Sequence, residues 1–444
     1  MENTLITMDN MPLKKFHYKL AAYTVGGMLI DGYILGIIEF ALVLIVPYMN
    51  MNPVWQGLIA SSPLMGILVG SLIFGRISDK IGRQLIYTWH FIILIICSFL
   101  QFFVNTPESL FALRLILGIS IGAEYAIGPS LLAEFLPIKL RGPLLSSLTI
   151  AWTLGYLCAT FLSYYLKDMG AESWRWMLSS SGVLGIIIMF FRAGAPESPR
   201  WLICHGQIEK AKEIVNKYFG PEVSIENLIA ESKSTTKELG YKFLFNKQMW
   251  KRTAFTSIFY FCQVMPFFAM VTFMPTVFNT LGVKNAFSGT LVFNGFLLFG
   301  AIVGVIIIDK ISRRKLLIGT FILSGIPLLL LGLVANVSST VVVICFCTFV
   351  FFGVIGGQLT YVYPPEVFPT ELRTSGYGFA TAISRVGAAS GTFLLPVLMS
   401  SFGINKALIM SAAVIAFGAL VSFAWAPETL KKSLSATASI SDSL

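Results

Sequence analysis

The feature that most restricts how this chain can fold is a series of twelve apolar segments, each about 20 residues long or longer. The hydrocarbon core of a bilayer is roughly 30 Å thick and a helix rises ~1.5 Å per residue, so a helix of about 20 apolar residues spans it. The segments are continuous rather than alternating, which favours helices over β-strands. They lie near residues 20–48, 56–75, 85–104, 109–134, 144–166, 175–193, 253–280, 287–308, 315–335, 340–363, 375–400 and 404–426. The sequence therefore predicts an all-α membrane protein with twelve transmembrane helices.

The composition agrees with a chain whose solvent is lipid. Of the residues, 56% are hydrophobic and only 12% are charged, whereas soluble domains carry about 25% charged residues. A chain of this size with so few charges cannot cover a single globular core with a polar surface. The first apolar segment is expected to stay as a membrane helix rather than be cleaved as a signal peptide, because it is long and follows a polar start.

The basic residues are distributed unevenly between the two sides of the predicted membrane domain. If the N-terminus is cytoplasmic, the outer loops contain only Lys167, Arg175, Lys284 and Lys406, and the helix interiors contain Arg114 and Arg385. The rest of the 32 Lys and Arg residues fall on the cytoplasmic side. This asymmetry predicts cytoplasmic termini and explains the net charge of +10 as a topology signal, so no nucleic-acid partner is expected.

Three polar motifs occur twice in the sequence. The pattern E-x-x-P-x-x-L-R starts at Glu134 and again at Glu366; GSLIFGRISDKIGR, which begins at Gly70, returns as GAIVGVIIIDKISR from Gly300; and APES returns as APET near the C-terminus. The three pairs have nearly the same separation along the chain. The second set of six helices is therefore predicted to be a copy of the first in the same orientation, an arrangement in which transporters bind substrate between the halves near the bilayer midplane.

These repeats define the expected domains. We predict an N-terminal six-helix bundle over 1–193, a cytoplasmic linker over 194–252, a C-terminal six-helix bundle over 253–430 and a cytoplasmic tail over 431–444. The linker contains HGQIEKAKEIVNKYFG and ESKSTTKELGYK, whose Lys/Glu spacing is typical of short amphipathic helices. Both a solvated connection and a regulatory role are compatible with it.

Each repeated motif falls at a predicted cytoplasmic helix end, where its charged residues can form ion pairs within or between the bundles. Such pairs would close the cytoplasmic side and break when that side opens. The alternative is that the basic loops only fix the topology. The predicted cytoplasmic gate comprises Asp79, Arg83, Glu134, Arg141, Asp309, Arg313, Glu366 and Arg373.

Taken together, these motifs resemble those of the major facilitator superfamily, and of its sugar-porter-like branch in particular. GRISDKIGR resembles the superfamily's loop motif between helices two and three, and RLILGISIGAEY, PESPRWL and YPPEVFPTELR are similar to further motifs of the branch. The resemblance covers most of the chain. It implies the fold of that superfamily, two pseudo-symmetric six-helix bundles that work by alternating access on a small-molecule substrate.

Within the superfamily, the GAEY and FPTELR elements look more like bacterial metabolite:proton symporters of the aromatic-acid, nicotinate and muconate type, and like organic cation and anion transporters. Helix seven keeps Gln263 but lacks the amide-rich run of sugar porters, and helix ten has Gln358 and Tyr361 where Pro and Trp would stand. Residues 31–34 read D-G-Y-I, without the second acid of the aromatic-acid symporters. The resemblance, with a short first outer loop, implies a multi-pass protein of the bacterial inner membrane.

Ionisable side chains inside the predicted helices are candidates for function, because each costs about 2.5–3.5 kcal/mol on insertion scales. Asp31 and Glu39 lie eight residues apart on helix one, about 80° apart in direction and roughly 12 Å apart along its axis, so both can face one cavity. Glu124 is expected to face the cavity or to pair with another helix. A carboxylate in a low-dielectric site can exchange a proton near neutral pH. We therefore predict Asp31, Glu39 and Glu124 as proton-coupling residues, the alternative being hydrogen-bonded structural acids.

Arg385 is the most informative charge, since its planar guanidinium suits a carboxylate bidentately. That carboxylate belongs either to a substrate or to Asp31 or Glu124 in the other half. Arg114 begins an R-x-x-x-G-x-x-x-G run whose Gly118 and Gly122 are expected to allow close helix packing. The predicted substrate-binding residues are Arg385, Arg114, Gln263, Asn294, Gln358 and Tyr361, beside a wall of phenylalanines suited to a flat apolar body (Phe259, Phe261, Phe267, Phe268 and Phe273).

Other chemistry-bearing residues give no further site. His90 is interpreted as a satisfied interfacial residue rather than a proton carrier, and the six cysteines as small hydrophobic side chains. The sequence has no GxxxxGK[ST] nucleotide cradle and no His/Cys/Asp cluster with metal-ligand spacing, so we expect no cofactor, no metal and no enzymatic activity. The expected partners are a small-molecule substrate, protons and membrane lipid, with the protein as a monomer.

The sequence thus predicts proton-coupled symport of a small organic acid. One alternative is a transporter of organic cations or drugs, in which Glu39 and Glu124 meet the positive charge, or of a sugar or polyol. A second alternative, of a different class, is a transporter-like scaffold or receptor that moves nothing.

Overall fold

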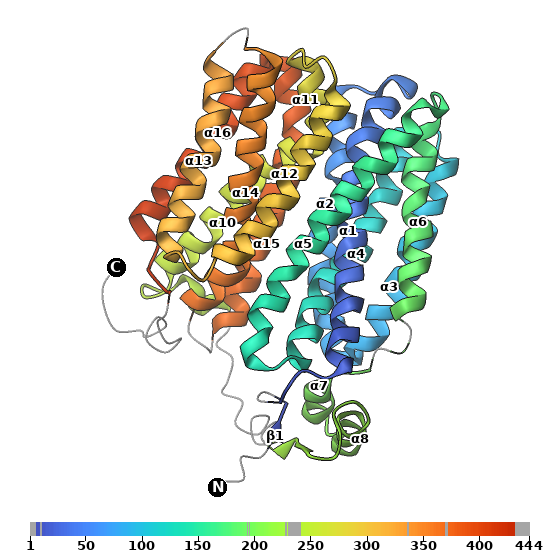
Figure 1. The fold of residues 1–444 in the computed structure, drawn as a ribbon, viewed down its shortest axis with the longest axis vertical. Coiled ribbons are helices and arrows are strands. Elements are labelled where there is room, and N and C mark those ends of the chain that lie inside the picture. The colour runs from blue at the N-terminus through green and yellow to red at the C-terminus, as the bar shows by residue number, and fades with distance from the viewer. Residues whose placement is uncertain are drawn as a thin grey trace.

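The computed structural model describes residues 6–8, 11–192, 194, 196–226, 229, 241–334, 337–368 and 372–430. Within these residues, twelve helices are long and apolar enough to cross a membrane, which confirms the predicted all-α class and helix number. The N half consists of α1 (Lys15–Tyr48), α2 (Pro53–Ile81), α3 (Arg83–Leu100), α4 (Pro107–Phe135), α5 (Ile138–Leu166) and α6 (Ser173–Arg192). The C half consists of α10 (Trp250–Thr272), α11 (Met274–Thr280), α12 (Ala286–Ile307), α13 (Arg313–Leu333), α14 (Ser339–Val367), α15 (Arg373–Phe402) and α16 (Ile404–Trp425) (Figure 1).

One predicted helix is in fact two. The segment predicted over 253–280 forms α10 and the short α11, with Phe273 between them. Pro275 lies at the start of α11 and has no N–H to donate to the carbonyl of Val271, so a continuous helix would leave that carbonyl without its partner.

Several helices begin where the sequence supplies a cap. Asn52 accepts a hydrogen bond from the N–H of Trp55 at the start of α2, and Thr106 accepts one from Ser109 at the start of α4. Each cap is followed by a proline, which suits the first helical position because its missing N–H would have no partner there.

The glycines of α4 set its distance from α2. A Cβ at Gly118 would overlap the backbone of Pro63, and a Cβ at Gly122 would overlap the carbonyl of Ile67. Small residues at these positions let the two helix backbones approach closely. This contact fixes the orientation of α4, which carries Arg114 and Glu124.

The two ends of the helical domain differ. The start of α1 and the end of α16 lie at the same end as α7 (Pro199–Cys204) and α8 (Ile208–Phe219) (Figure 1). We call this end the terminal face. We call the opposite end the loop face; it carries η1 (Gln101–Phe103), η2 (Lys167–Met169) and the connection from α11 to α12.

The segment between the halves is attached to the N half at its beginning. β1 (Ile6–Thr7) pairs in parallel with β2 (Val223–Ser224), and the ring of Phe219 in α8 packs against Phe16 and Phe135.

Near its end the same segment contacts the C half, because η3 (Tyr241–Phe245) packs against α10 and α15. The second predicted amphipathic stretch, near 231–242, lies mostly outside the described residues.

The halves meet mainly along α2 with α15 and α5 with α12, and α1 also contacts α10 and α11. Two aromatic pairs also cross between them: Trp152 contacts Phe268 edge to face at 5.9 Å, and Phe40 stacks on Phe287 at 4.6 Å.

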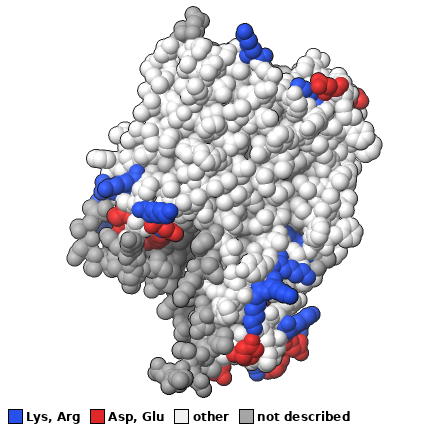
Figure 2. All heavy atoms as spheres, viewed as in Figure 1, with Lys and Arg blue, Asp and Glu red and all other residues white. Residues whose placement is uncertain are grey.

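Charged side chains lie at the two ends of the molecule and leave an uncharged band across the middle of the face drawn in Figure 2. Exposed side chains of the membrane helices include the rings of Phe190, Phe191 and Phe423. In a membrane these apolar groups contact lipid chains rather than water.

Candidate functional site

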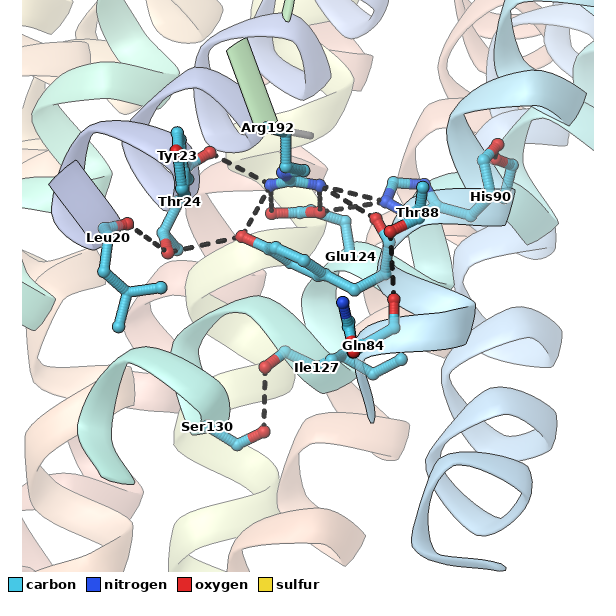
Figure 3. Close-up of polar contacts among 12 residues, drawn as sticks. Leu20, Tyr23, Thr24, Gln84, Thr88, His90, Glu124, Ile127, Ser130 and Arg192 are labelled. Carbon is cyan, nitrogen blue, oxygen red and sulfur yellow. Dashed lines mark hydrogen bonds and ion pairs between the residues drawn. The ribbon is translucent and has the colours of Figure 1, made fainter. Parts of the chain in front are cut away.

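The N half contains a buried ion pair between Arg192, the last residue of α6, and Glu124 of α4. The guanidinium donates two hydrogen bonds to the carboxylate, from Nη1 to Oε2 at 2.7 Å and from Nη2 to Oε1 at 2.8 Å (Figure 3). Arg192 is 2% exposed and Glu124 is fully buried. Such a bidentate, charge-assisted pair is rigid and is expensive to break inside a low-dielectric core.

Helices α1 and α3 complete the surroundings of this pair. Arg192 donates to the hydroxyl of Tyr87 at 2.6 Å and to the carbonyl of Tyr23 at 3.0 Å, while His90 Nε2 lies 3.1 Å from Glu124 Oε2 (Figure 3). Gly27 of α1 leaves room for the pair, because a Cβ there would overlap both Glu124 and Arg192. Four helices therefore hold this charge cluster, which comprises Glu124, Arg192, His90, Tyr87 and the neighbouring Asp31.

Asp31 of α1 is the unusual member of the cluster. It is fully buried, and neither carboxylate oxygen has a hydrogen-bond partner among the described residues. The charged groups that act on it are Glu124 and Arg192. Because Arg192 is already paired with Glu124, Asp31 is left as a second carboxyl group beside a neutralised pair.

The structure differs from the sequence prediction at two residues of this region. The sequence predicts Arg192 outside the helix interiors, whereas it is the last residue of α6 and is buried as the partner of Glu124. The interpretation of His90 as an interfacial residue is wrong, because His90 is buried against the same carboxylate. Arg192 follows directly on an apolar run and precedes a Gly- and Pro-containing stretch, which made it look like a helix boundary.

A cavity lies between the halves. It is lined from the N half by Met28, Tyr125, Thr149 and Trp152, and from the C half by Tyr260, Gln263, Val264, Phe267, Phe268, Gly353, Val354, Gly357, Thr360, Tyr361 and Arg385. This mixture of aromatic walls with a few polar groups is typical of a small-molecule site.

Arg385 is the charged residue that lines the cavity. Its guanidinium stacks on the ring of Tyr125 from the other half, 4.8 Å from the ring centre. The titratable neighbours that act on it are tyrosines of both halves, Tyr125, Tyr260, Tyr361 and Tyr377. Within the described part of the chain, Arg385 forms no ion pair. The sequence suggests Asp31 or Glu124 as its partner within the protein, but Glu124 is paired with Arg192.

The predicted substrate residues divide into two groups. Arg385, Gln263 and Tyr361 line the cavity. Gln263 also donates to the carbonyl of Gly353 at 2.6 Å.

The other three predicted substrate residues do not line the cavity. Gln358 donates to the carbonyl of Ala301 at 2.7 Å, and Asn294 donates to Glu39 and Thr160. Arg114 is buried, and its Nε and Nη2 have no partner among the described residues.

Aromatic residues of the cavity were predicted only in part. Of the five phenylalanines, Phe267 and Phe268 line it, whereas Phe259, Phe261 and Phe273 do not. Tyr125, Trp152 and Tyr260 were missed, although each is an aromatic residue with a polar atom inside an apolar run, which is the signal that could have identified them.

The predicted gate residues form an ion-pair network at the terminal face of each half. In the N half, Arg83 pairs with Glu134, which also accepts from the hydroxyl of Ser198. Glu197 accepts from the backbone N–H of Gln84 at 3.0 Å, at the start of α3.

The C half repeats this arrangement. Arg313 pairs with Glu366 at 3.3 Å and with Asp309 at 2.9 Å, and the hydroxyl of Thr429 donates to Glu366 at 2.5 Å. Each of these contacts joins elements of one half. The side chains of Asp79, Arg141 and Arg373 lie outside the described residues.

Glu428 occupies the place of Glu197 in the C half. Burial acts to raise the pKa of Glu428, but hydrogen bonds from Ser312 and from the N–H groups of Leu430, Arg314 and Arg313 outweigh it, so the pKa lies below its ordinary value of 4.5. The carboxylate therefore caps the start of α13 in its ionised form.

No group of three or more His, Cys, Asp or Glu side chains among the described residues is arranged to hold a metal ion.

Comparison with known proteins gives full-length relatives. Residues 13–440 match the family described as "Sugar (and other) transporter". The inner membrane metabolite transport protein YgcS of Escherichia coli is 40% identical over 432 residues, which cover 97% of this chain and 95% of YgcS. The putative metabolite transport protein YaaU of Escherichia coli is 34% identical over 435 residues, with 97% of each chain covered.

Solved structures with the same fold include the inward-open xylose transporter XylE from E. coli, with a TM-score of 0.81 and 18% identity over 95% of this chain and 99% of XylE. The proton:xylose symporter XylE bound to 6-bromo-6-deoxy-D-glucose gives a TM-score of 0.76 and 20% identity, over 94% and 98% of the two chains. These likenesses confirm the predicted twelve-helix fold. The matched family and the structural neighbours are transporters rather than enzymes.

Proposed function

Because this chain belongs to the family of sugar and other transporters, the sugar-porter-like branch of the major facilitator superfamily, we propose that it is a symporter that couples protons to the uptake of a small organic acid. The observation that carries this proposal is Arg385, a buried cation that lines the central cavity and has no ion pair among the described residues. A substrate carboxylate would supply the missing counter-charge through two parallel hydrogen bonds.

The walls of the cavity support a flat or apolar substrate body. Trp152, Phe267 and Phe268 present rings to the cavity, and the indole N–H of Trp152 has no acceptor among the described residues. A carboxylate bound at Arg385 would lie between donors from both halves, which is where an alternating-access transporter holds its substrate.

Asp31 supports the proton-coupling part of the proposal. A buried carboxyl group whose two oxygens have no donor is suited to carrying a proton in this conformation and to releasing it in another. We keep Asp31 and Glu39 as the proposed proton carriers. We assign Glu124 a positioning role, because Arg192 binds both oxygens of its carboxylate.

We also propose how the protein sits in its membrane. The uneven distribution of Lys and Arg supports a cytoplasmic location for the terminal face, and the relative YgcS is described as an inner membrane protein. The chain would act as a monomer in a bacterial inner membrane, with the networks around Glu134 and Glu366 as the cytoplasmic gate.

Uptake into proteoliposomes tests the proposal. Labelled small carboxylates and sugars should be supplied with and without an imposed pH gradient to the wild type, Arg385→Ala, Arg385→Lys and Asp31→Asn. Loss of a charge-assisted bond of about 1.5–3 kcal/mol predicts that both Arg385 variants weaken carboxylate affinity roughly 10- to 100-fold. Asp31→Asn is expected to remove the response to the gradient.

Ser384→Ala is a matched control, since this neighbouring hydroxyl only bonds the carbonyl of Thr381 within α15. Gradient-independent carboxylate uptake that Arg385→Ala and Asp31→Asn both retain would refute the proposal.

A sugar or polyol is the second candidate, because Gln263, Thr149 and Thr360 add polar groups to the cavity and XylE is described as a proton:xylose symporter. Saturable pentose or hexose uptake, with no competition from carboxylates, would favour it.

A further inference from the structure

A polar contact between the halves lies on the loop-face side of the cavity. Asn294 of α12 donates from Nδ2 to Glu39 Oε2 of α1 at 3.2 Å and to Thr160 Oγ1 of α5 at 2.8 Å. Glu39 is 1% exposed, and Asn294 is fully buried. One amide of the C half therefore joins two helices of the N half.

The hydroxyl of Thr160 fixes how the Asn294 amide is oriented. Thr160 donates its proton to the carbonyl of Tyr156 at 3.0 Å, so it can only accept from Asn294. The amide nitrogen must then point at Thr160 and Glu39, and the amide oxygen must point elsewhere.

This orientation leaves two buried acceptors without partners, Glu39 Oε1 and Asn294 Oδ1. With Glu39 ionised both atoms can only accept, so neither can satisfy the other, and each buried orphan is costly. A single proton on Oε1 turns it into a donor that Oδ1 can accept. Carboxyl group and amide would then be joined by two hydrogen bonds instead of one.

We propose that Glu39 and Asn294 form a proton-dependent latch that holds the two halves together at the loop face. The inference rests on the proposed symport, and it assigns one of the transported protons to the contact between the halves. Loss of the proton removes the second bond and leaves a buried carboxylate, which favours separation of the halves and entry of water.

Neighbouring contacts agree with a closed loop face at this level. Phe40, next to Glu39, stacks on Phe287 of α12, and the ammonium group of Lys167 in η2 lies 4.9 Å from the centre of the same Phe287 ring. The latch lies beneath this aromatic contact, about 12–14 Å from the loop-face ends of α1 and α12.

The other charged groups around Glu39 are few. From the N half, Tyr156 of α5 lies beside it, and Arg114 of α4 acts on Tyr156. The α6 residue Arg175 binds carbonyls at the loop face, nine residues further along α1 at the level of Tyr48.

The remaining elements beside α1 supply no nearer charge. α11 and α12 contain no charged residue. The basic residues Lys251 and Arg252 of α10, and Arg76 of α2, lie near the terminal-face ends of their helices. The charge cluster around Asp31 lies about 12 Å away along α1.

Pulsed spin-label distance measurements on the full chain in lipid nanodiscs test the latch without substrate. Labels at Met169→Cys and Lys284→Cys, both exposed on the loop face in opposite halves, report its opening after Cys158 and Cys204 are replaced by serine. In the wild type we expect the longer distance to gain population as the pH rises from 5 to 9.

The variants separate the proton from the contact itself. Glu39→Gln, whose amide can donate to Oδ1 without a proton, should keep the short distance at every pH. Asn294→Ala should raise the open-to-closed ratio about 3- to 10-fold at low pH. Ser163→Ala removes a hydroxyl without a partner one turn from Thr160 and should match the wild type.

Infrared difference spectroscopy supplies a direct readout, a carboxylic acid C=O band that titrates in the wild type and is missing in Glu39→Gln. The latch is refuted if Glu39→Gln opens the loop face as much as Asn294→Ala, or if the wild-type distances do not change with pH. Either result leaves proton-coupled uptake to be judged separately by the proteoliposome assay.

Discussion

The two halves of this protein have matching charged networks at the terminal face but different centres. Arg83 with Glu134 in the N half corresponds to Arg313 with Glu366 in the C half. Ser198 and Thr429 each donate to the glutamate of their own half. The sequence repeats that revealed the duplication are the ones that build these networks.

At the centre the halves have diverged. The N half buries Asp31 beside the ion pair of Glu124 with Arg192, whereas the C half presents Arg385 and polar aromatic groups to the cavity. A duplicated scaffold has thus kept the chemistry that both halves need at the membrane surface. Its centres have diverged, in agreement with the roles proposed above, proton handling in the N half and substrate binding in the C half.

The largest expected effect is a difference in the free energy of unfolding between variants of Arg192 and Arg385. Arg192→Ala leaves Glu124 buried without its partner and should destabilise the fold by about 3–5 kcal/mol. Arg385→Ala breaks no ion pair among the described residues and should destabilise it far less, although it weakens substrate binding. Thermal unfolding of both variants in the same lipid measures the difference.

The double variant Glu124→Gln, Arg192→Gln is the control for that comparison. It removes both charges together and should recover much of the stability lost in Arg192→Ala. Equal losses for Arg192→Ala and Arg385→Ala would show that the N half does not depend on its ion pair.

The second prediction contrasts two acids inside the N half. Asp31→Leu keeps the branched shape and removes two oxygens without partners, so it should stabilise the fold by about 1–3 kcal/mol while abolishing the proton response. Glu124→Leu should destabilise it, because Arg192 would lose its counter-ion. A loss of stability in Asp31→Leu, measured by the same unfolding assay, would contradict this prediction and would mean that the Asp31 carboxyl group stabilises the fold.

These contrasts also mark the limit of sequence reasoning. Apolar segments gave the twelve helices because lipid imposes length and continuity on each of them. The positions of Arg385, Gln263 and Tyr361 at the cavity could be anticipated because polar groups in such helices rarely face lipid. Asn294 and Gln358 also avoid lipid, but they bind other protein groups. Whether such a residue meets substrate or protein depends on how the helices pack, which the sequence does not reveal.

Arg192 shows the same limit more sharply. Its partner Glu124 is 68 residues away in sequence, and nothing in the local pattern distinguishes a buried arginine at a helix end from a basic residue that anchors the membrane surface. Only the approach of α3, α4 and α6 around Gly27 reveals the difference.

The third prediction compares the two terminal-face caps. Glu428→Gln should cost about 0.3–1 kcal/mol at neutral pH, because the carboxylate caps the start of α13 in a partly exposed site. Since the pKa of Glu428 is lowered in the fold, this contribution is present above the ordinary value of 4.5 and is lost as the pH falls through the lower folded value. Denaturation at pH 7 and at acidic pH should therefore show the gap between variant and wild type closing on acidification.

The matched change in the N half, Glu197→Gln, affects a carboxylate that accepts one N–H of α3. Its loss should be smaller than that of Glu428→Gln. A larger loss would reverse the ranking of the two caps.

The smallest effect concerns the linker, whose segment around β2 is attached to the N half at the terminal face. Lys14 donates to Glu222 at 2.6 Å and ties the segment around β2 to the start of α1. This hydrogen bond lowers the pKa of Glu222, so the contact is complete at neutral pH and is lost as the pH falls through the folded value, below 4.5. Glu222→Gln should leave global unfolding unchanged and should speed amide hydrogen exchange in β1 (Ile6–Thr7) at pH 7, while Glu226→Gln, an exposed neighbour, should not. Unchanged exchange in Glu222→Gln would mean that the strand pairing and the Phe219 contacts hold the linker to the N half without help from this ion pair. Faster exchange would show that the Lys14–Glu222 ion pair helps to hold the linker to the N half.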